Sequence, residues 1–135
     1  MISSAETAPI AEINKMNVNK KAVIVNAGKG LEDDTFKRLS EVLSEEIPDN
    51  KIVSISGPSH AEEVALGYPT TVTVASLDRD AMYCIQDELS NESFRIYACD
   101  DIIGVEMGGA MKNIIALCAG ICDGMGYGDN TKAAL

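Results

Sequence analysis

A change in character near residue 101 constrains the fold of this chain more than any other feature of its sequence. Before it, short β-branched runs alternate with amphipathic stretches, whereas residues 102–121 are apolar and rich in small residues. The alternation is typical of an open α/β sheet with helical crossovers, and the apolar segment, with glycines at helical spacing, predicts one long helix packed closely on most sides. We therefore expect part of an α/β domain over residues 1–100 and the start of an all-helical domain over residues 101–135.

The first part contains four expected strands, each bounded by turn residues or by the start of a helix. Density of β-branched and other apolar residues predicts them at residues 21–26, 52–56, 70–75 and 94–97. Because helical segments separate the strands, the sheet is expected to be parallel and Rossmann-like, representing the C-terminal part of such a domain. The order in which the strands pair cannot be read from the pattern.

Helices are predicted from the spacing of apolar residues and from residues that favour helix ends. Residues 33–47 have helical periodicity and are followed by Pro48, and residues 5–16 also look helical. Ser59 and Glu62 have the spacing of a capping box for a short helix closed by Gly67. Asp78 is a plausible N-cap for a helix that runs to about residue 89.

Composition excludes several classes of function. A net charge of −10 with eleven Lys and Arg residues disfavours a nucleic acid partner. The apolar stretches are interrupted before they reach membrane-spanning length, and the first residues do not resemble a secretion signal, so no membrane span and a cytoplasmic location are expected. Cys118 and Cys122 are one helical turn apart, but with His60 as the only histidine we expect no metal site.

Lys112 is the most informative residue for chemistry, because it is the only charged residue between Glu106 and Asp123. An isolated ammonium in an apolar helix is costly unless it is paired or neutralised. Gly104, Gly108 and Lys112 fall on one helical face, where glycines let a backbone or ligand approach. Such a lysine could act as an acid or base if its pKa fell by about 3 units. The alternative is a surface lysine whose stem covers apolar neighbours.

Two strand-to-helix junctions could complete a site around this lysine. Lys29 lies between two glycines directly after the first strand, where open α/β sheets bind ligands, and it is the candidate second cation that would lower the pKa of Lys112. Gly57-Pro-Ser-His-Ala61 follows the second strand, and its amides and the Ser59 hydroxyl could face a polar ligand or phosphate. A solvated turn lysine and a simple helix cap are the structural alternatives.

These segments together resemble the NAD(P)-dependent glycerol-3-phosphate dehydrogenases. That family has a Lys-Gly-Leu-Glu segment after a strand, a Gly-Pro-Ser-His-Ala segment after the next, and Gly-Gly-Ala-Leu-Lys-Asn at the start of its helical domain. The matching segments here are Lys29-Gly-Leu-Glu32, Gly57-Pro-Ser-His-Ala61 and Gly108-Gly-Ala-Met-Lys-Asn113, continued by Ala119-Gly-Ile-Cys-Asp-Gly-Met-Gly-Tyr-Gly-Asp-Asn-Thr-Lys-Ala-Ala134.

The resemblance implies an oxidoreductase that interconverts sn-glycerol 3-phosphate and dihydroxyacetone phosphate by hydride transfer with NAD or NADP, feeding glycerophospholipid synthesis. It implies that Lys112 is the catalytic proton acceptor and also contacts substrate. Asn113, Gly57 and Ser59 would contact substrate, Lys29 would contact both substrate and cofactor, and Ala61 would line the cofactor site. A homodimer is one assembly that the resemblance allows.

Two family features are missing from the 135 residues, and two rival interpretations stay open. No G-x-G-x-x-G follows a strand, and the family's arginine-asparagine pair for the substrate phosphate is missing, so this chain alone is expected to be inactive and to bind NAD(P) poorly. One rival is a hydroxyacid dehydrogenase of the same superfamily, although those have an asparagine where this chain has Ala116. The other is a non-catalytic α/β binding module in which Lys29 and Lys112 are structural.

Overall fold

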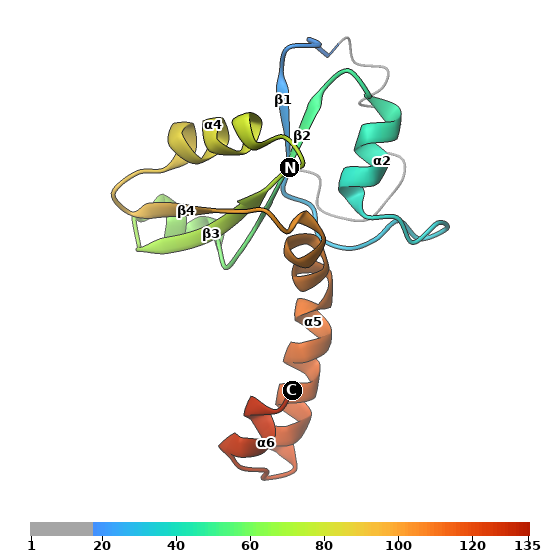
Figure 1. Ribbon diagram of the computed structural model, residues 1–135. Helices are drawn as coiled ribbons and strands as arrows, with labels where there is room; N and C mark the ends of the chain where they lie inside the picture. The colour runs from blue at the N-terminus through green and yellow to red at the C-terminus, as the bar shows by residue number, and fades with distance from the viewer. Residues whose placement is uncertain (1–17) are drawn as a thin grey trace.

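The computed structural model describes residues 18–135, which form a four-stranded sheet, helices packed on it, and one long helix that projects from it (Figure 1). The strands are β1 (Val23–Asn26), β2 (Lys51–Ser56), β3 (Thr70–Ala75) and β4 (Phe94–Cys99). The helices are α2 (Leu39–Glu46), α3 (Ala61–Ala65), α4 (Arg79–Leu89), α5 (Ile102–Gly124) and α6 (Asp129–Ala133). The helix expected at residues 5–16 lies outside the described residues.

The sheet has the order β1-β2-β3-β4 and is mixed, so the expected α/β class is confirmed but the expected parallel pairing is wrong at one pair. β1 and β2 are parallel, as are β3 and β4, whereas β2 and β3 are antiparallel, with Ser54 opposite Ala75. Parallel strands are usually joined by a helix that packs on the sheet, but the connection between β2 and β3 holds only α3, a helix of five residues of which none is buried.

Two hydrophobic cores lie on opposite faces of the sheet, and adjacent residues of β2 contribute to different cores. Ile52 packs with Leu39 and Leu43 of α2, whereas Val53 packs with Met82 of α4. Side chains alternate between the faces of a strand, so α2 covers one face and α4 the other. Figure 1 shows these two helices on different sides of the sheet.

Helix α2 begins at Leu39, not at residue 33 as expected. Residues 33–38 form a turn instead, in which the Phe36 amide bonds to the Glu32 carbonyl at 2.9 Å and the Thr35 hydroxyl donates to the Glu32 carboxylate. Phe36 is exposed and has a φ of 57°. Local side-chain hydrogen bonds here compete with helix formation, which apolar spacing alone does not reveal.

The N-terminal cap predicted for α4 is confirmed, whereas the one predicted for α3 is wrong. Asp78 caps α4, because its carboxylate accepts from the Ala81 amide at 2.9 Å, as predicted. The capping box of Ser59 and Glu62 is wrong, since α3 begins after His60 without a side-chain cap. Glu62 instead lies 3.1 Å from Nδ1 of His60, so its carboxylate is directed away from the role that the spacing predicted.

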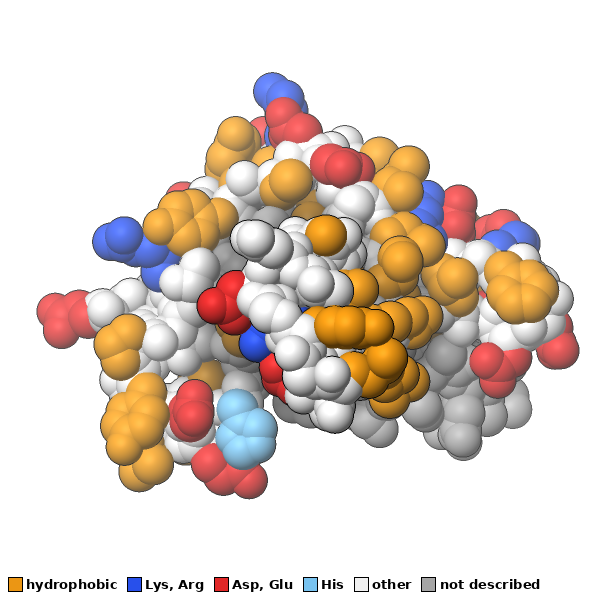
Figure 2. Space-filling model, turned by 90° about the horizontal axis from the view of Figure 1, so that it is seen from below, with side chains coloured by type: hydrophobic (Ala, Val, Ile, Leu, Met, Phe, Trp, Pro, Cys, Tyr) orange, Lys and Arg blue, Asp and Glu red, His pale blue; other side chains and the backbone are white. Residues whose placement is uncertain are grey.

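Helix α5 is the single long helix that the sequence predicts, but its expected close packing on most sides is wrong. Asp101 caps it by accepting from the Gly104 amide at 2.8 Å. Only Ile102, Glu106 and Cys122 of its residues are buried, and hydrophobic side chains gather around its exposed end (Figure 2). The exposed large apolar residues are Ile103, Met111, Ile114, Ile115, Leu117 and Ile121.

By length and composition alone, α5 could cross a membrane, which the sequence analysis did not expect. Its central residues oppose such a span. Lys112 and Asn113 are near the middle of the helix, and a lysine at the centre of a bilayer costs about 2.5–3.5 kcal/mol on insertion scales. The first turns of α5 also pack on β2 and β3 rather than standing free.

Candidate active site

A cleft of about 320 Å³ lies where the first turns of α5 cross the ends of the sheet strands. Its volume is at the lower end of the range for small-molecule sites. Lys29, Gly57 and Lys112, which the sequence analysis singled out, come together here from the loop after β1, the end of β2 and the middle of α5. The other lining residues are Ser56, Pro58, Thr73, Gly104, Val105, Gly108 and Gly109.

The loop that carries Lys29 is shaped by Asn26, the last residue of β1. Asn26 is buried, and its side-chain oxygen accepts a hydrogen bond from the Gly28 amide at 3.0 Å. This Asx turn bends the chain directly before Lys29. The lysine stem then lies against α5, because a Cβ added to Gly109 would be 3.6 Å from Cγ of Lys29. Asn26 therefore shapes the loop that brings Lys29, which is exposed, to the cleft.

Two glycines allow the backbone segments around the cleft to approach closely. A Cβ on Gly57 would be 2.8 Å from Cα of Val72, so no other residue fits there without moving β3. A Cβ on Gly109 would be 2.9 Å from the Ser56 hydroxyl. The expected close approach at Gly104 and Gly108 is wrong, and Gly109 makes the contact with the sheet instead. A Cβ on Gly104 would meet only the Asp101 side chain that caps α5, and a Cβ on Gly108 would meet no heavy atom of the described residues within 4 Å apart from chain neighbours and the backbone of α5.

Lys112 lines the cleft but is exposed, so the expected dry, buried ammonium is wrong for this chain. The lysine nevertheless lies at the same cleft as both strand-to-helix junctions. Two lysine side chains that line one cleft favour an anion such as a phosphate or an alkoxide.

Ser59, Ala61 and Asn113 do not line the cleft and are exposed. Their predicted substrate and cofactor contacts therefore stay predictions. Within residues 18–135, no group of three or more His, Cys, Asp or Glu side chains could hold a metal ion.

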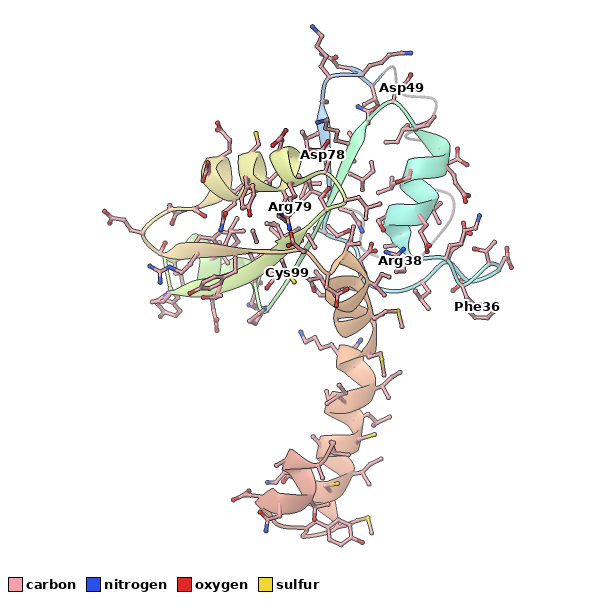
Figure 3. The ribbon with its side chains drawn as sticks, viewed as in Figure 1. Phe36, Arg38, Asp49, Asp78, Arg79 and Cys99 are labelled. Atoms are coloured by element: carbon pink, nitrogen blue, oxygen red, sulfur yellow. The ribbon has the colours of Figure 1, made fainter. Side chains whose placement is uncertain are left out.

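Glu106 is a buried residue beside the cleft that the sequence analysis did not identify. Its carboxylate accepts from the Ser40 amide at 3.0 Å, the Ser40 hydroxyl at 2.6 Å and the Ser54 hydroxyl at 3.0 Å. Arg38, labelled in Figure 3 beside the start of α5, donates to it at 3.1 Å. The only signal in the sequence is a lone carboxylate in an apolar helix.

Two protein-family models match this chain and show its family. The N-terminal domain model of NAD-dependent glycerol-3-phosphate dehydrogenase matches residues 1–82, and the C-terminal domain model of the same family matches residues 101–135. The chain belongs to the NAD-dependent glycerol-3-phosphate dehydrogenase family. The predicted resemblance is confirmed, and so is NAD or NADP as the cofactor of the family.

Relatives within the glycerol-3-phosphate dehydrogenase family are similar over most of this chain. A glycerol-3-phosphate dehydrogenase [NAD(P)+] from Clostridium perfringens is 55% identical over 121 residues, which cover 90% of this chain and 37% of the relative. One from Desulfitobacterium hafniense is 60% identical over 113 residues, covering 84% of this chain and 32% of the relative. The chain thus spans about a third of the length of these relatives.

Solved glycerol-3-phosphate dehydrogenase structures share the fold. The enzyme from Coxiella burnetii superimposes with a TM-score of 0.81 at 37% identity, covering 94% of this chain and 38% of that structure. The enzyme from Plasmodium falciparum gives a TM-score of 0.88 at 27% identity, covering 98% and 38%. The mixed sheet and the projecting α5 therefore match the corresponding part of longer enzymes.

Proposed function

We propose that this chain forms the proton-transfer and substrate-binding part of an enzyme that interconverts sn-glycerol 3-phosphate and dihydroxyacetone phosphate with NAD or NADP. The observation that supports this proposal is the meeting of Lys112 and Lys29 in one glycine-lined cleft. The family membership and the names of the relatives agree with it. We further propose a cytoplasmic enzyme without a membrane span, divided after residue 100, with supply of glycerophospholipid synthesis as its role.

The proposed chemistry assigns one proton transfer to this chain. In the oxidation direction, Lys112 takes the proton of the substrate's secondary alcohol through its Nζ as the carbonyl forms. In the reverse direction, its ammonium returns that proton to the same oxygen, so one group serves as both base and acid. Lys29 stabilises negative charge on the substrate and, with Gly57, Ser59 and Asn113, holds it beside Lys112.

The residues of the cleft fit the reacting end of an NAD(P) cofactor. NAD(P) supplies or accepts the hydride when bound. Gly108 leaves the cleft open, because apart from its chain neighbours and the backbone of α5 no heavy atom of the described residues lies within 4 Å of a Cβ added there. Lys29 and Ala61 would contact the cofactor. The 135 residues contain no G-x-G-x-x-G for its pyrophosphate, so we expect the chain alone to bind NAD(P)H more weakly than micromolar by calorimetry and to show no turnover.

The proposal is tested by replacing Lys112 with alanine in a full-length enzyme that carries this segment, built by placing residues 1–135 in the Clostridium perfringens relative. Loss of a general acid and base typically lowers turnover by about 10²–10⁴-fold. Because Lys112 is exposed, the melting temperature should change little.

The matched control is Lys20→Ala. Lys20 is also exposed and is paired with Asp49 at 2.5 Å, away from the cleft. The Lys20→Ala variant should leave kcat and KM unchanged. Equal turnover of the Lys112→Ala and unaltered enzymes would contradict the proposal and favour a non-catalytic α/β module. A preference for 3-hydroxy acids over glycerol 3-phosphate would instead identify a related hydroxyacid dehydrogenase.

A further inference from the structure

The Glu106 carboxylate is the polar anchor between the start of α5 and the rest of the domain. Its side chain is only 7% exposed and receives hydrogen bonds from three residues, Arg38, Ser40 and Ser54. A buried carboxylate is tolerated only when it is paired and hydrogen-bonded, and this one is both. The donors belong to the start of α2 and to β2, so the carboxylate joins α5 to two elements.

The contacts of Glu106 and Gly109 set how α5 lies along the end of β2. Ser54 and Ser56 point to the same face of the strand because they are two residues apart. Ser54 bonds to Glu106, and Ser56 approaches Gly109 one helical turn later. Lys112, one further turn along, lines the cleft with Gly57. Successive turns of α5, starting with the turn that carries Glu106, therefore lie along the end of β2.

Few other side chains of α5 could fix this register near the cleft. Gly104, Gly108 and Gly109 have no side chains with which to interdigitate, and Ile102 is the only other buried residue in the first half of the helix. A helix face made of glycines could slide or rotate against β2 unless a directional contact prevents it. The four hydrogen bonds of Glu106 are directional contacts, and they hold α5 in one position.

We propose that Glu106 is a positioning residue, whose bonds to Ser40, Ser54 and Arg38 hold Lys112 in the cleft opposite Lys29, so that both side chains reach the same substrate. This inference rests on the proposed function, and it assigns Glu106 a role through Lys112 without contact to substrate. A displacement of about 1 Å in a reacting group can lower turnover by roughly 100-fold, so the anchor matters for rate as well as for folding.

The first test measures position without activity. In the 135-residue chain, a short amine-reactive cross-linker should join Lys29 to Lys112, and mass spectrometry gives the yield relative to singly modified Lys29. Glu106→Gln keeps the size of the side chain but places an NH2 group among donors, so the cross-link yield should fall several-fold. Glu41→Gln is the matched control, because Glu41 also pairs with Arg38, at 3.0 Å, but does so from within α2. It should leave the yield unchanged.

The second test measures turnover in the full-length enzyme that carries this segment. Per folded molecule, Glu106→Gln should lower kcat about 10- to 100-fold, by more than KM rises, whereas Glu41→Gln should stay within about twofold. Circular dichroism gives the folded fraction. If Glu106→Gln does not fold, Ser54→Ala removes one donor without burying an unpaired charge, and it should lower both cross-link yield and kcat by a smaller factor.

The outcomes separate the two proposals. An unchanged cross-link yield, or a lower melting temperature with normal kcat per folded molecule, would overturn the positioning role. A lower yield together with a lower kcat supports it. If the enzyme without any substitution fails to turn over glycerol 3-phosphate while Glu106→Gln still lowers the yield, the proposed function falls and the anchoring of Lys112 stands.

Discussion

At Gly57 the backbone of β3 occupies the space that a side chain would need. A Cβ there would lie 2.8 Å from Cα of Val72, and backbone atoms of a central strand cannot move aside cheaply. Overpacking of this kind typically costs about 1–3 kcal/mol. We expect Gly57→Ala to lower the free energy of unfolding by that amount, measured by urea denaturation.

Gly108→Ala is the matched control, and its effect on the free energy of unfolding should be absent or of opposite sign. Apart from chain neighbours and the backbone of α5, no heavy atom of the described residues lies within 4 Å of the added Cβ, and alanine is the better helix former by about 1 kcal/mol. The variant should therefore be as stable as the unaltered chain or more stable. If both substitutions destabilise equally, the close approach at Gly57 is not the cause.

The residues of the cleft differ in how far the sequence could predict them. Lys29 and Gly57 follow strands, and Lys112 interrupts an apolar helix, so local patterns identified all three, and the structure brings them to one cleft. Glu106 depends on Ser54 and Ser40, which are 52 and 66 residues away in the chain. Such partners have no periodic signal, and only the folded arrangement reveals them.

Helix α4 is capped by a carboxylate whose charge should make its stability depend on pH. A hydrogen bond from Lys51 at 2.6 Å, together with the Ala81 amide, holds the pKa of Asp78 below its ordinary value of 3.8. A lowered pKa means that the folded state favours the charged form, so this stabilisation is complete well above pH 3.8 and is lost as pH falls below it.

The variant Asp78→Asn isolates this charge, because asparagine is also a good N-cap. We expect a lower urea midpoint than that of the unaltered chain at pH 7. The gap between the two midpoints should close as pH falls through and below about 3.8, when the native carboxylate becomes protonated. A gap that is constant from pH 7 to pH 2.5 would show that the charge contributes nothing.

Elements were predictable from the sequence where their signals are local. The four strands, the Asp78 cap and the single helix α5 were all indicated by β-branched runs, a capping residue and glycine spacing. The start of α2 was not, because Glu32 and Thr35 bond within a turn that has the same apolar spacing as a helix. The antiparallel pair was missed because pairing direction depends on whether the connecting helix packs on the sheet, and the residues of α3, which the sequence indicated as a helix, are all left unburied.

Across the whole molecule, buried apolar surface is concentrated in the sheet and in α2 and α4, and little of it lies on α5. Leu43 of α2 is 1% exposed, whereas Leu117 of α5 is 67% exposed. Since hydrophobic stabilisation scales with the apolar area removed from water, the α/β part should supply most of the free energy of folding. The outer half of α5 should behave as a helix with few tertiary contacts.

Two leucine-to-alanine substitutions measure this uneven distribution. Leu43→Ala leaves a cavity in a closed core and should lower the free energy of unfolding by about 2–5 kcal/mol. Leu117→Ala removes a side chain that is mostly in water and should change it by less than about 0.5 kcal/mol. Urea denaturation of the 135-residue chain, monitored by circular dichroism, gives both values. A large loss for Leu117→Ala would mean that this face of α5 is covered in solution.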